Sequence, residues 1–388
     1  MNRFFLFLSV AYLSMNGWIL WWFWRTLRGD GRARGIVCFG LLALMSFFPM
    51  LYRHSGTSFS FWETMALRAG CFWIGSYIYV FFMTLILDVG RLFGRPLKKR
   101  LENLETSQPG YKRAFGVLLL TFCIGLGGWL NASFPVLRET RLEIEVPESL
   151  AATLPRSVSV AAIADIHLGR VNGVSRLVRA VDLLLPHKPD AVFYVGDVLD
   201  DHIAVDEPGL KREVERLSPP LGTWGVLGNH EYISGPVDVS IAIMERSGIR
   251  VLRDEWVALG ETVVVAGRDD FSKARFEPAP RKSLEEILRN SADDQRRLPL
   301  IVLDHQPQRL EEAERAEAVL QLSGHTHNGQ LWPFNLVVAR IYENARGTYK
   351  RDDTHYIVSV GTGTWGPPLR NNARPEVILV HLDFVGSK

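Results

Sequence analysis

The sequence predicts a chain of two parts, a transmembrane region of about four helices followed by an α/β domain with two mixed sheets and helices on the outside. Two observations carry this prediction. Apolar segments crowd the first third of the 388 residues, and further along short β-rich runs alternate with polar turns and helical stretches. We expect the transmembrane region over 1–137, a connector with the first strand over 138–157, and the main domain over 158–388.

The apolar segments span residues 4–24, 36–51, 69–87 and 114–134, and none has a charge in its middle. Each reaches or approaches the length of about 20 residues that crosses a bilayer. A cleaved signal peptide is the alternative for the first segment, but its apolar run is long and no small-residue cleavage site follows. A buried helical bundle is the alternative for all four. Against it stand tryptophans that resemble an interfacial anchor, which are Trp18, Trp21, Trp22 and Trp24.

The orientation follows from the positive charges between the segments. The first loop holds Arg25, Arg28, Arg32 and Arg34, whereas the second holds only Arg53 and Arg68. The third loop is again basic, with Arg91, Arg95, Lys98, Lys99, Arg100, Lys112 and Arg113. Because basic loops stay in the cytoplasm, we expect both termini outside and the main domain extracytoplasmic, in the inner or plasma membrane of a bacterium.

The main domain is acidic, because most of the basic excess lies before residue 138. Of 44 Lys+Arg and 42 Asp+Glu residues, 14 and 5 lie there, which leaves 30 basic and 37 acidic residues afterwards. A broad electrostatic surface for nucleic acid is therefore excluded. Cys38, Cys71 and Cys123 all fall in the apolar segments, so the main domain has neither disulfides nor thiolate ligands.

Strands and helices alternate through the main domain. Residues 141–146 alternate polar and apolar, as a half-buried strand does. Helices are predicted over 175–185 and 237–247. Further strands are predicted over 158–164, 191–195, 223–227, 262–266, 300–303, 318–322, 336–341, 356–360 and 377–382.

Polar clusters follow five of these strands, where α/β sheets place their ligand sites. They are Asp165-Ile-His167, Gly196-Asp197, Gly228-Asn229-His230-Glu231, Asp304-His305 and Gly324-His325-Thr-His327. In an extended segment residues i and i+2 point the same way, so each D-x-H or H-x-H pair is expected to direct two ligands into one pocket. The glycines allow tight turns and close backbone approach.

The donor types select a metal class. Carboxylate oxygen with imidazole nitrogen suits Mn²⁺, Fe or Zn²⁺ better than Ca²⁺ or Mg²⁺. Eight candidate donors are too many for one tetrahedral ion, and two ions about 3.5–4 Å apart would use them. We expect two divalent ions, with Mn²⁺ first and Fe or Zn²⁺ as alternatives.

This ordered series resembles the calcineurin-like metallophosphoesterase superfamily, whose motifs run D-x-H, G-D, G-N-H-[DE], H and G-H-x-H. All five occur in order between about residues 158 and 380, and the segments 324–330 and 361–370 are similar to the bacterial membrane-associated branch. The resemblance implies a four-layer α/β/β/α sandwich of two mixed sheets. It implies that one metal is held by Asp165, His167 and His327, a second by Asn229, His305 and His325, and that Asp197 bridges them.

The resemblance also implies catalytic roles. His230 would face the phosphate and either donate to it or protonate the leaving oxygen, and Asp200 would orient that histidine. Where relatives have an arginine after this carboxylate, the sequence has Asp201, so a phosphate-clamping arginine has to come from elsewhere. Arg370 and Arg346 are the candidates for substrate binding.

The expected function is a membrane-anchored binuclear phosphoesterase that hydrolyses a phosphate ester or pyrophosphate by metal-activated hydroxide. The expected partners are the bilayer and a phosphorylated small molecule or lipid; the oligomeric state stays open. A nucleotide or nucleotide-sugar pyrophosphatase is the enzymatic alternative. A catalytically silent membrane sensor or assembly module is the alternative of another class, against which the intact ligand set argues.

An apolar run follows the last ligands, over residues 331–338. A core strand is one interpretation. The other is that Trp332, Phe334 and Trp365 form an apolar lip beside the metals that meets lipid.

Overall fold

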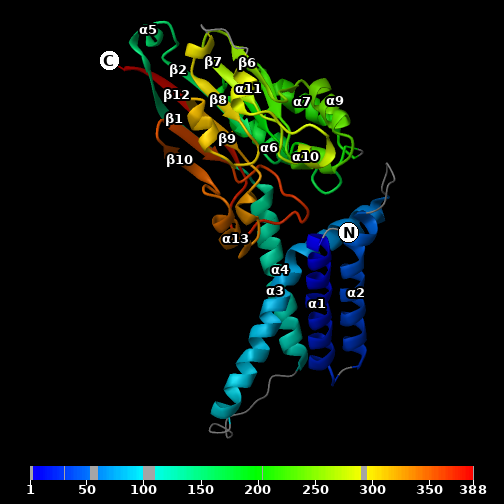
Figure 1. Ribbon diagram of the computed structural model, residues 1–388. Helices are drawn as coiled ribbons and strands as arrows, with labels where there is room; N and C mark the ends of the chain where they lie inside the picture. The colour runs from blue at the N-terminus through cyan, green and yellow to red at the C-terminus, as the bar shows by residue number, and fades with distance from the viewer. Residues whose placement is uncertain are drawn as a thin grey trace. The chain divides into compact units, whose positions relative to one another are not determined.

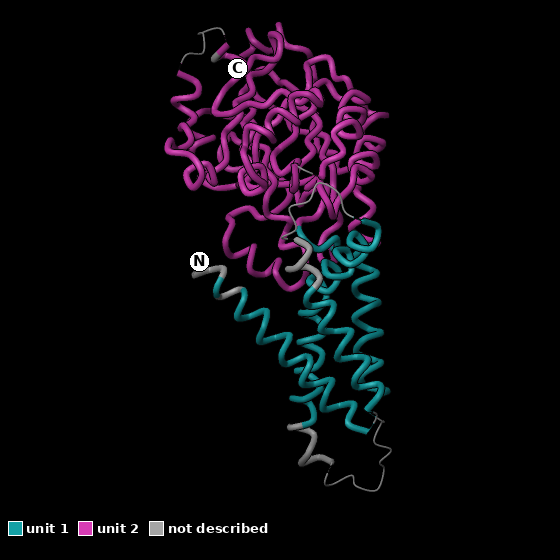
Figure 2. Tube along the Cα trace, turned by 90° about the vertical axis from the view of Figure 1, so that its right-hand side faces the viewer, with its two compact units in different colours: residues 1–129, 366–369 teal, residues 130–365, 370–388 magenta. Residues whose placement is uncertain are grey.

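The computed structural model describes residues 3–29, 31–52, 60–98, 110–202, 204–289 and 295–387. The described residues form two compact units, one of residues 1–129 with 366–369 and one of residues 130–365 with 370–388 (Figure 2). Arg53, Lys99 and Arg100, which enter the charge argument, lie outside the described residues.

The first unit is helical. The first three predicted apolar segments lie in α1 (Arg3–Thr26), α2 (Gly31–Tyr52) and α3 (Phe61–Lys98), and the fourth lies in α4 (Gly110–Ser133) except for residue 134. The first three helices pack on one another through a buried cluster that includes Trp22, Leu41 and Trp73. Within the described residues, two helices are long and apolar enough to cross a membrane, over Phe61–Arg91 and Gly110–Ser133. A transmembrane region of four helices is therefore not confirmed, and membrane association is suggested by two.

The second unit contains two sheets of six strands, and both are mixed (Figure 1). In the first sheet β12 is antiparallel to β2 while the other pairs are parallel. Its order is β1 (Val136–Pro147), β12 (Glu376–Ser387), β2 (Ser157–Ile163), β3 (Ala191–Val195), β4 (Thr223–Val226) and β5 (Arg250–Val251).

The second sheet has antiparallel strands at both edges and parallel strands between them. Its order is β10 (Gly347–Arg351), β11 (Thr354–Val358), β9 (Ala318–Ser323), β8 (Leu300–Leu303), β7 (Val263–Gly267) and β6 (Glu255–Leu259). The parallel strands β7, β8 and β9 end at one edge of this sheet, as β2, β3 and β4 do in the first.

The two sheets face each other across a shared core. Along β2, Val158, Val160 and Ala162 enter the core between the sheets, and Ala161 and Ile163 enter the core on the opposite face. This alternation follows from the pleat of a strand, which turns successive side chains to opposite faces. Residues of β7, β8, β9 and β11 complete the inner core.

Helices cover the outer faces, so the layers run α/β/β/α as expected. The helices on the first sheet are α6 (Ser175–Leu184), α7 (Glu207–Leu217) and α9 (Val237–Arg246), and those on the second are α11 (Leu284–Leu288) and α12 (Glu311–Arg315). The remaining helices are short: α5 (Glu148–Ala151), α8 (Asn229–Ile233), α10 (Lys273–Phe276) and α13 (Phe334–Ile341).

The strand predicted over 336–341 is wrong, because these residues belong to α13. Pro333 precedes the helix, a position at which proline is tolerated because the first N–H groups of a helix have no partner within it. None of the residues of α13 is buried, so the core-strand interpretation of this run is also wrong.

Candidate metal centre

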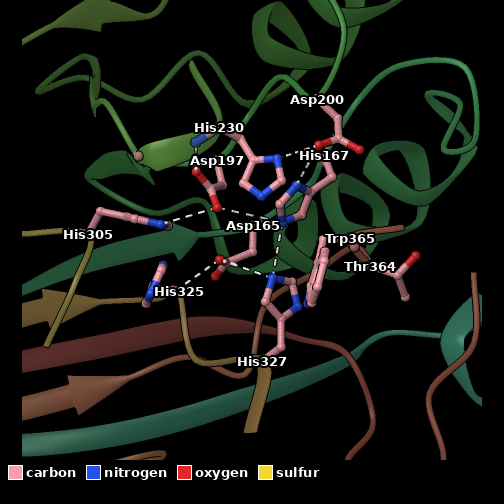
Figure 3. A network of polar contacts seen from close by, with 12 residues as sticks. Asp165, His167, Asp197, Asp200, His230, His305, His325, His327, Thr364 and Trp365 are labelled. Carbon is pink, nitrogen blue, oxygen red and sulfur yellow. Dashed lines mark hydrogen bonds and ion pairs between the residues drawn. The ribbon is translucent and has the colours of Figure 1, made fainter. Parts of the chain in front are cut away.

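The predicted ligands come from strand ends of both sheets, and six of them meet in one cluster, which are Asp165, His167, Asp197, His305, His325 and His327 (Figure 3). The seventh, Asn229, directly precedes His230 at the start of α8. Three groups follow β2, β3 and β4 of the first sheet, and two follow β8 and β9 of the second. Parallel strands in each sheet bring these ends to one edge, and the face-to-face packing of the sheets brings the two edges together.

The imidazole and carboxylate atoms form overlapping groups in which every pair lies within 4.8 Å. One group joins Asp165, His167 and His327, and another joins Asp197, His305 and His325. Nε2 of His167 lies 3.0 Å from Nε2 of His327, and Nε2 of His327 lies 3.3 Å from Oδ1 of Asp165. These two groups correspond to the two metal sites expected from the sequence.

Asp197 lies between the two groups. Its Oδ2 is 3.7 Å from Nε2 of His167 and 3.2 Å from Nε2 of His305. One carboxylate oxygen therefore contacts a ligand of each expected metal, which is the position that a bridging carboxylate occupies in a two-metal site.

Several donor atoms are buried without a hydrogen-bond partner in the described part of the chain. They include Oδ2 of Asp165 and Oδ1 of Asn229. Leaving a buried polar atom without a partner costs about 1–3 kcal/mol, more when it is charged. Both atoms belong to expected ligands and would be satisfied by a divalent ion. The donor set therefore fits the expected metals.

The D-x-H and H-x-H pairs converge, but the expectation that they lie in extended segments is wrong. Asp165 and His167 follow the end of β2 and are not extended, since their φ angles are 53° and 55°. His325 and His327 are likewise left-handed, with φ of 69° and 46°. This conformation is uncommon in residues other than glycine and is found at functional sites, where surrounding contacts hold it.

Close approach explains two of the motif glycines. A Cβ on Gly228 would lie 2.2 Å from Oδ1 of Asp197, and one on Gly324 would lie 2.3 Å from Oδ2 of Asp165. No side chain fits at either position, because the backbone passes against a carboxylate of the cluster.

His230 and Asp200 form a hydrogen-bonded pair at the edge of the cluster. Oδ1 of Asp200 lies 2.5 Å from Nδ1 of His230 and 3.3 Å from Nδ1 of His167. Burial alone would raise the pKa of the Asp200 carboxyl, but the hydrogen bonds from both rings hold it well below its usual range. Burial alone would lower the pKa of His230, but the charge of Asp197 and the contact with Asp200 raise it to about 9 in the metal-free protein.

The two histidines of the H-x-H motif have lowered pKa values, in contrast to His230. Burial lowers the pKa of His325 to about 4 and the pKa of His327 to about 3, in spite of nearby carboxylates. Both rings are therefore neutral at physiological pH, which is the form of imidazole that binds metals.

The surrounding backbone and carboxylates orient the ligands. Nδ1 of His305 donates to the carbonyl of Val195 at 2.9 Å, which leaves Nε2 to face Asp197. Glu231 accepts from the N–H groups of Gly228 and Asp197 at 2.7 and 3.1 Å, so this buried carboxylate joins two ligand turns.

Asp304 is held away from its neighbour's ring. Its carboxylate forms a bidentate pair with Arg281 at 2.9 and 3.1 Å and lies 3.3 Å from Arg268. These contacts fit a structural carboxylate at a strand end.

The two arginines expected at the substrate lie in different environments. Arg370 is completely buried, and its Nη2 lies 2.8 Å from Nδ1 of His327. Arg346 is exposed just before β10, and within the described residues its side chain makes no hydrogen bond or ion pair with the cluster. The structure thus brings Arg370 to the site and leaves Arg346 outside it.

The contacts of residues 361–365 with the ligand turn were not anticipated. Gly363 donates to the carbonyl of Asp165 at 2.7 Å, and a Cβ on Gly363 would lie 2.0 Å from the carbonyl oxygen of Ile166. Trp365 lies beside the site, with its ring centroid 6.5 Å from that of His230. The density of Gly and Thr in this segment was the available signal, since small residues permit such close backbone approach.

Apolar side chains are exposed near the site, on α13 and on the turns beside it. The three residues predicted to form an apolar lip, Trp332, Phe334 and Trp365, are among them. Leu336, Val337 and Ile341 are exposed as well, and from here on the apolar lip means all six side chains, which are 43% to 66% exposed. Gln330 connects the lip to the cluster, because it exchanges hydrogen bonds of 3.0 and 3.1 Å with the backbone of Trp365 and follows His327 by three residues.

Comparison with known proteins finds the relatives of this chain among phosphoesterases. The profile of the calcineurin-like phosphoesterase family matches residues 158–329. An uncharacterised metallophosphoesterase of Aquifex aeolicus is 33% identical over 264 residues, which cover 68% of this chain and 98% of that protein. A transmembrane protein with a metallophosphoesterase domain from Danio rerio is 27% identical over 78% of this chain and 70% of its own length. An uncharacterised metallophosphoesterase of Bacillus subtilis is 27% identical over 70% of this chain and 95% of its own length.

Proposed function

The chain belongs to the calcineurin-like phosphoesterase family and is a phosphoester hydrolase, and from this premise we propose that it uses two divalent metal ions to hydrolyse a lipid-borne phosphate ester or pyrophosphate. The observation that carries the binuclear part is the position of Asp197, whose Oδ2 contacts a histidine of each group.

The proposed ligands are those expected from the sequence. Asp165, His167 and His327 hold one ion, Asn229, His305 and His325 hold the other, and Asp197 bridges. Mn²⁺ is the proposed native metal, with Fe and Zn²⁺ as alternatives for this mixture of oxygen and nitrogen donors. When bound, two such ions lower the pKa of water and neutralise charge on the phosphoryl group.

The residues around the ions supply orientation and a proton. His230 is proposed to protonate the leaving oxygen, because Asp200 holds its ring and favours its charged form. A positioned general acid contributes about 10²–10⁴-fold to such a reaction. Asn229 precedes His230, so one turn carries both a proposed ligand and the proposed acid.

A direct experiment tests the hydrolase. The full-length protein in mild detergent is expected to hydrolyse a generic aryl phosphodiester with Mn²⁺ and to lose at least about 10³-fold in kcat on chelation or in the Asp197→Asn variant. Glu245→Gln, which changes a carboxylate on the last turn of α9, is the matched control and is expected to remain active. Turnover that survives both chelation and Asp197→Asn would rule the proposal out.

A lipid substrate is supported by the apolar lip. Large apolar side chains that lie together on the surface often mark a site that binds an apolar partner. Trp365 belongs to the lip and lies beside His230, so a phosphate in the cluster would have its apolar remainder close to these residues. Two helices of membrane-spanning length, and relatives named as transmembrane proteins, also support a location at a bilayer.

The lipid proposal is tested by comparing one phosphate ester in two forms, free in solution and carried on a diacyl lipid in mixed micelles. Leu336→Asp with Ile341→Asp is expected to lower the lipid-to-soluble ratio of kcat/KM by at least about tenfold, because each buried aliphatic side chain is worth about 1.5–3 kcal/mol. Val385→Asp, an exposed apolar position on β12, is the control. An unchanged ratio would favour a soluble substrate, such as a nucleotide or nucleotide-sugar pyrophosphate.

The location is proposed to be a bacterial inner or plasma membrane, with the catalytic domain outside the cytoplasm. The basic residues between the first and second and between the third and fourth apolar segments support this orientation; in the structure Arg32 and Arg34 belong to the first turn of α2, and Arg91 and Arg95 to the end of α3. Reporter fusions at the C-terminus test it: an alkaline phosphatase fusion is expected to be active and a green fluorescent protein fusion dark. The reverse pattern would invert the orientation.

A further inference from the structure

We propose that Arg91 and Arg113 form a binding site for the headgroup phosphate of an anionic phospholipid, where α1 ends and α4 begins beside the C-terminal part of α3. The site is separate from the metal centre, because its residues belong to the first unit and the expected metal ligands belong to the second. The inference goes beyond the proposed function and rests on the proposed membrane location alone.

The end of α1 and the start of α4 lie against each other. A Cβ on Gly110, the first residue of α4, would lie 2.0 Å from the carbonyl oxygen of Thr26, the last residue of α1. Only glycine permits this approach, because any side chain would overlap with the carbonyl group. Arg113 follows Gly110 by three residues, and the charges of Arg113 and Arg25 both act on Arg91 of α3. Three helices therefore bring three arginines into one group.

A single carboxylate lies within this group. Asp88 of α3 is 12% exposed, and its Oδ1 accepts from Nη1 of Arg91 at 3.1 Å and from Nε1 of Trp22 at 3.2 Å. Its Oδ2 accepts from Arg25. Within the described residues Asp88 makes no hydrogen bond or ion pair with Arg113. Three guanidinium groups and one carboxylate leave two positive charges in excess.

Two donor atoms of the group are buried and have no hydrogen-bond partner in the part of the chain that the structure describes. They are Nη2 of Arg91 and Nε of Arg113. An exposed arginine would satisfy such donors with water, whereas a buried donor of a charged group is costly without a partner. Helix packing alone would favour apolar side chains at these positions. Phosphate oxygens would satisfy both donors and neutralise the excess charge, since guanidinium groups form strong hydrogen bonds to phosphate.

Neighbouring tryptophans indicate the depth of this group in a bilayer. Trp21 and Trp24 are 48% and 51% exposed, and the guanidinium groups of Arg25 and Arg34 lie 4.2 and 4.1 Å from their ring centroids. Tryptophan rings gather at the headgroup level of a membrane. Lipid phosphates lie at that level, so the buried donors would meet them without a charge entering the hydrocarbon core.

The charge of the group selects the class of lipid. A zwitterionic headgroup carries an ammonium group beside its phosphate, which the excess positive charge repels, whereas an anionic headgroup such as that of phosphatidylglycerol carries none. Basic pockets between membrane helices on the cytoplasmic side are typical sites for anionic headgroups. The proposed orientation places this end of the helices on the cytoplasmic side, because the basic loops adjoin it.

The test measures lipid binding directly, by native mass spectrometry of the full-length protein in mild detergent, titrated with dioctanoyl-phosphatidylglycerol or dioctanoyl-phosphatidylcholine. Wild type is expected to bind the first phosphatidylglycerol at least about tenfold more tightly than the first phosphatidylcholine. Arg113→Gln removes a buried donor without breaking a contact of Asp88 and is expected to raise the Kd for phosphatidylglycerol at least about tenfold. Helical content measured by circular dichroism shows whether the variant is folded, so the test does not require activity.

The control is Arg28→Gln, which removes the same charge from an exposed position just beyond the end of α1. Its Kd for phosphatidylglycerol is expected to change less than about twofold, because exposed charges contribute little. Equal changes in Arg28→Gln and Arg113→Gln would mean that binding depends on net charge alone and would overturn the proposal. Arg91→Gln, which removes the other buried donor, replaces Arg113→Gln if that variant does not fold, and a raised Kd is again expected.

Inorganic phosphate distinguishes a lipid site from a site for free phosphate. At equal concentration it is expected to leave phosphatidylglycerol bound, because it has no acyl chains to contact the helices. Displacement of the lipid, or equal affinity for the two lipids in wild type, would overturn the proposal. Binding in detergent depends neither on the metal ions nor on turnover, so the hydrolase and the lipid site can fail independently.

Discussion

The Asp200→Asn variant gives a prediction whose size and pH dependence both follow from the His230–Asp200 pair. Oδ1 of Asp200 lies 2.5 Å from Nδ1 of His230. Two carboxylates, Asp197 and Asp200, overcome the effect of burial and raise the pKa of His230 from 6.5 to about 9 in the metal-free protein. At about 1.36 kcal/mol for each pKa unit, the net stabilisation of the charged ring is roughly 3 kcal/mol.

Metal ions change how much each carboxylate raises the pKa of His230. When the two sites are filled, the charge of Asp197 is neutralised by the ions, so Asp200 becomes the carboxylate that maintains the charged ring. Replacing it by asparagine is expected to lower the pKa of His230, because burial, which lowers it, remains while the charged hydrogen-bond partner, worth about 1.5–3 kcal/mol, is lost. The protonated fraction would then fall about tenfold or more at pH 8, whereas at pH 6 it would change about twofold or less.

The assay is a pH profile of kcat with a poor leaving group, such as a phenyl phosphate ester, and with 4-nitrophenyl, which leaves without a proton. Because the acid form of His230 is lost as pH rises through its pKa, the wild-type rate is expected to fall on the alkaline side of the profile. On the phenyl ester, Asp200→Asn is expected to lose about tenfold or more at pH 8 and about twofold or less at pH 6. On the 4-nitrophenyl ester the change is expected to be small at both pH values.

Asp201→Asn is the matched control, since this neighbouring carboxylate pairs with Arg170. An equal loss at both pH values, or an equal loss on both esters, would refute the reasoning and assign Asp200 to support of His167 instead.

Three further predictions concern the support of the site. Glu231→Ala removes the acceptor of buried backbone N–H groups and is expected to lower the free energy of unfolding by about 3 kcal/mol, measured by urea denaturation; a loss below about 1 kcal/mol would contradict it. Gly363→Ala would place a methyl group 2.0 Å from the carbonyl oxygen of Ile166 and is expected to displace the metal-binding turn, so Mn²⁺ content on purification should fall; unchanged content would count against the contact. Chelation is expected to lower Tm by about 5 °C or more in wild type and by little in Asp197→Asn, and an equal shift in both would place the stabilising metal elsewhere.

The strands and the ligand set could be predicted because both depend on short-range pattern. The strands over 191–195 and 300–303 are bounded as predicted, since each is a short apolar run that ends at a polar turn. The candidate ligands were predicted from their types and their order along the chain, and the structure brings the carboxylates and imidazoles among them together. The pairing of β1 with β12, which joins residues 136 and 376, has no local signal and could not be predicted.

The errors have physical causes. The run Phe334–Ile341 contains valine and isoleucine and alternates poorly, so periodicity could not separate strand from helix, and the assumption that apolar residues are buried favoured a strand. The D-x-H pair was assumed to be extended, but the left-handed φ angles of Asp165 and His167 depend on backbone contacts with other strand ends. The contact of Arg370 with His327 spans 43 residues and follows from the packing of a loop, which no pattern specifies.

The central claim is that two metal ions share Asp197, and anomalous scattering from crystals of the Mn²⁺-loaded protein tests it most directly. Two peaks about 3.5–4 Å apart are expected, one beside Asp165, His167 and His327 and the other beside Asn229, His305 and His325. A single peak, or two peaks that do not both contact Asp197, would contradict the account.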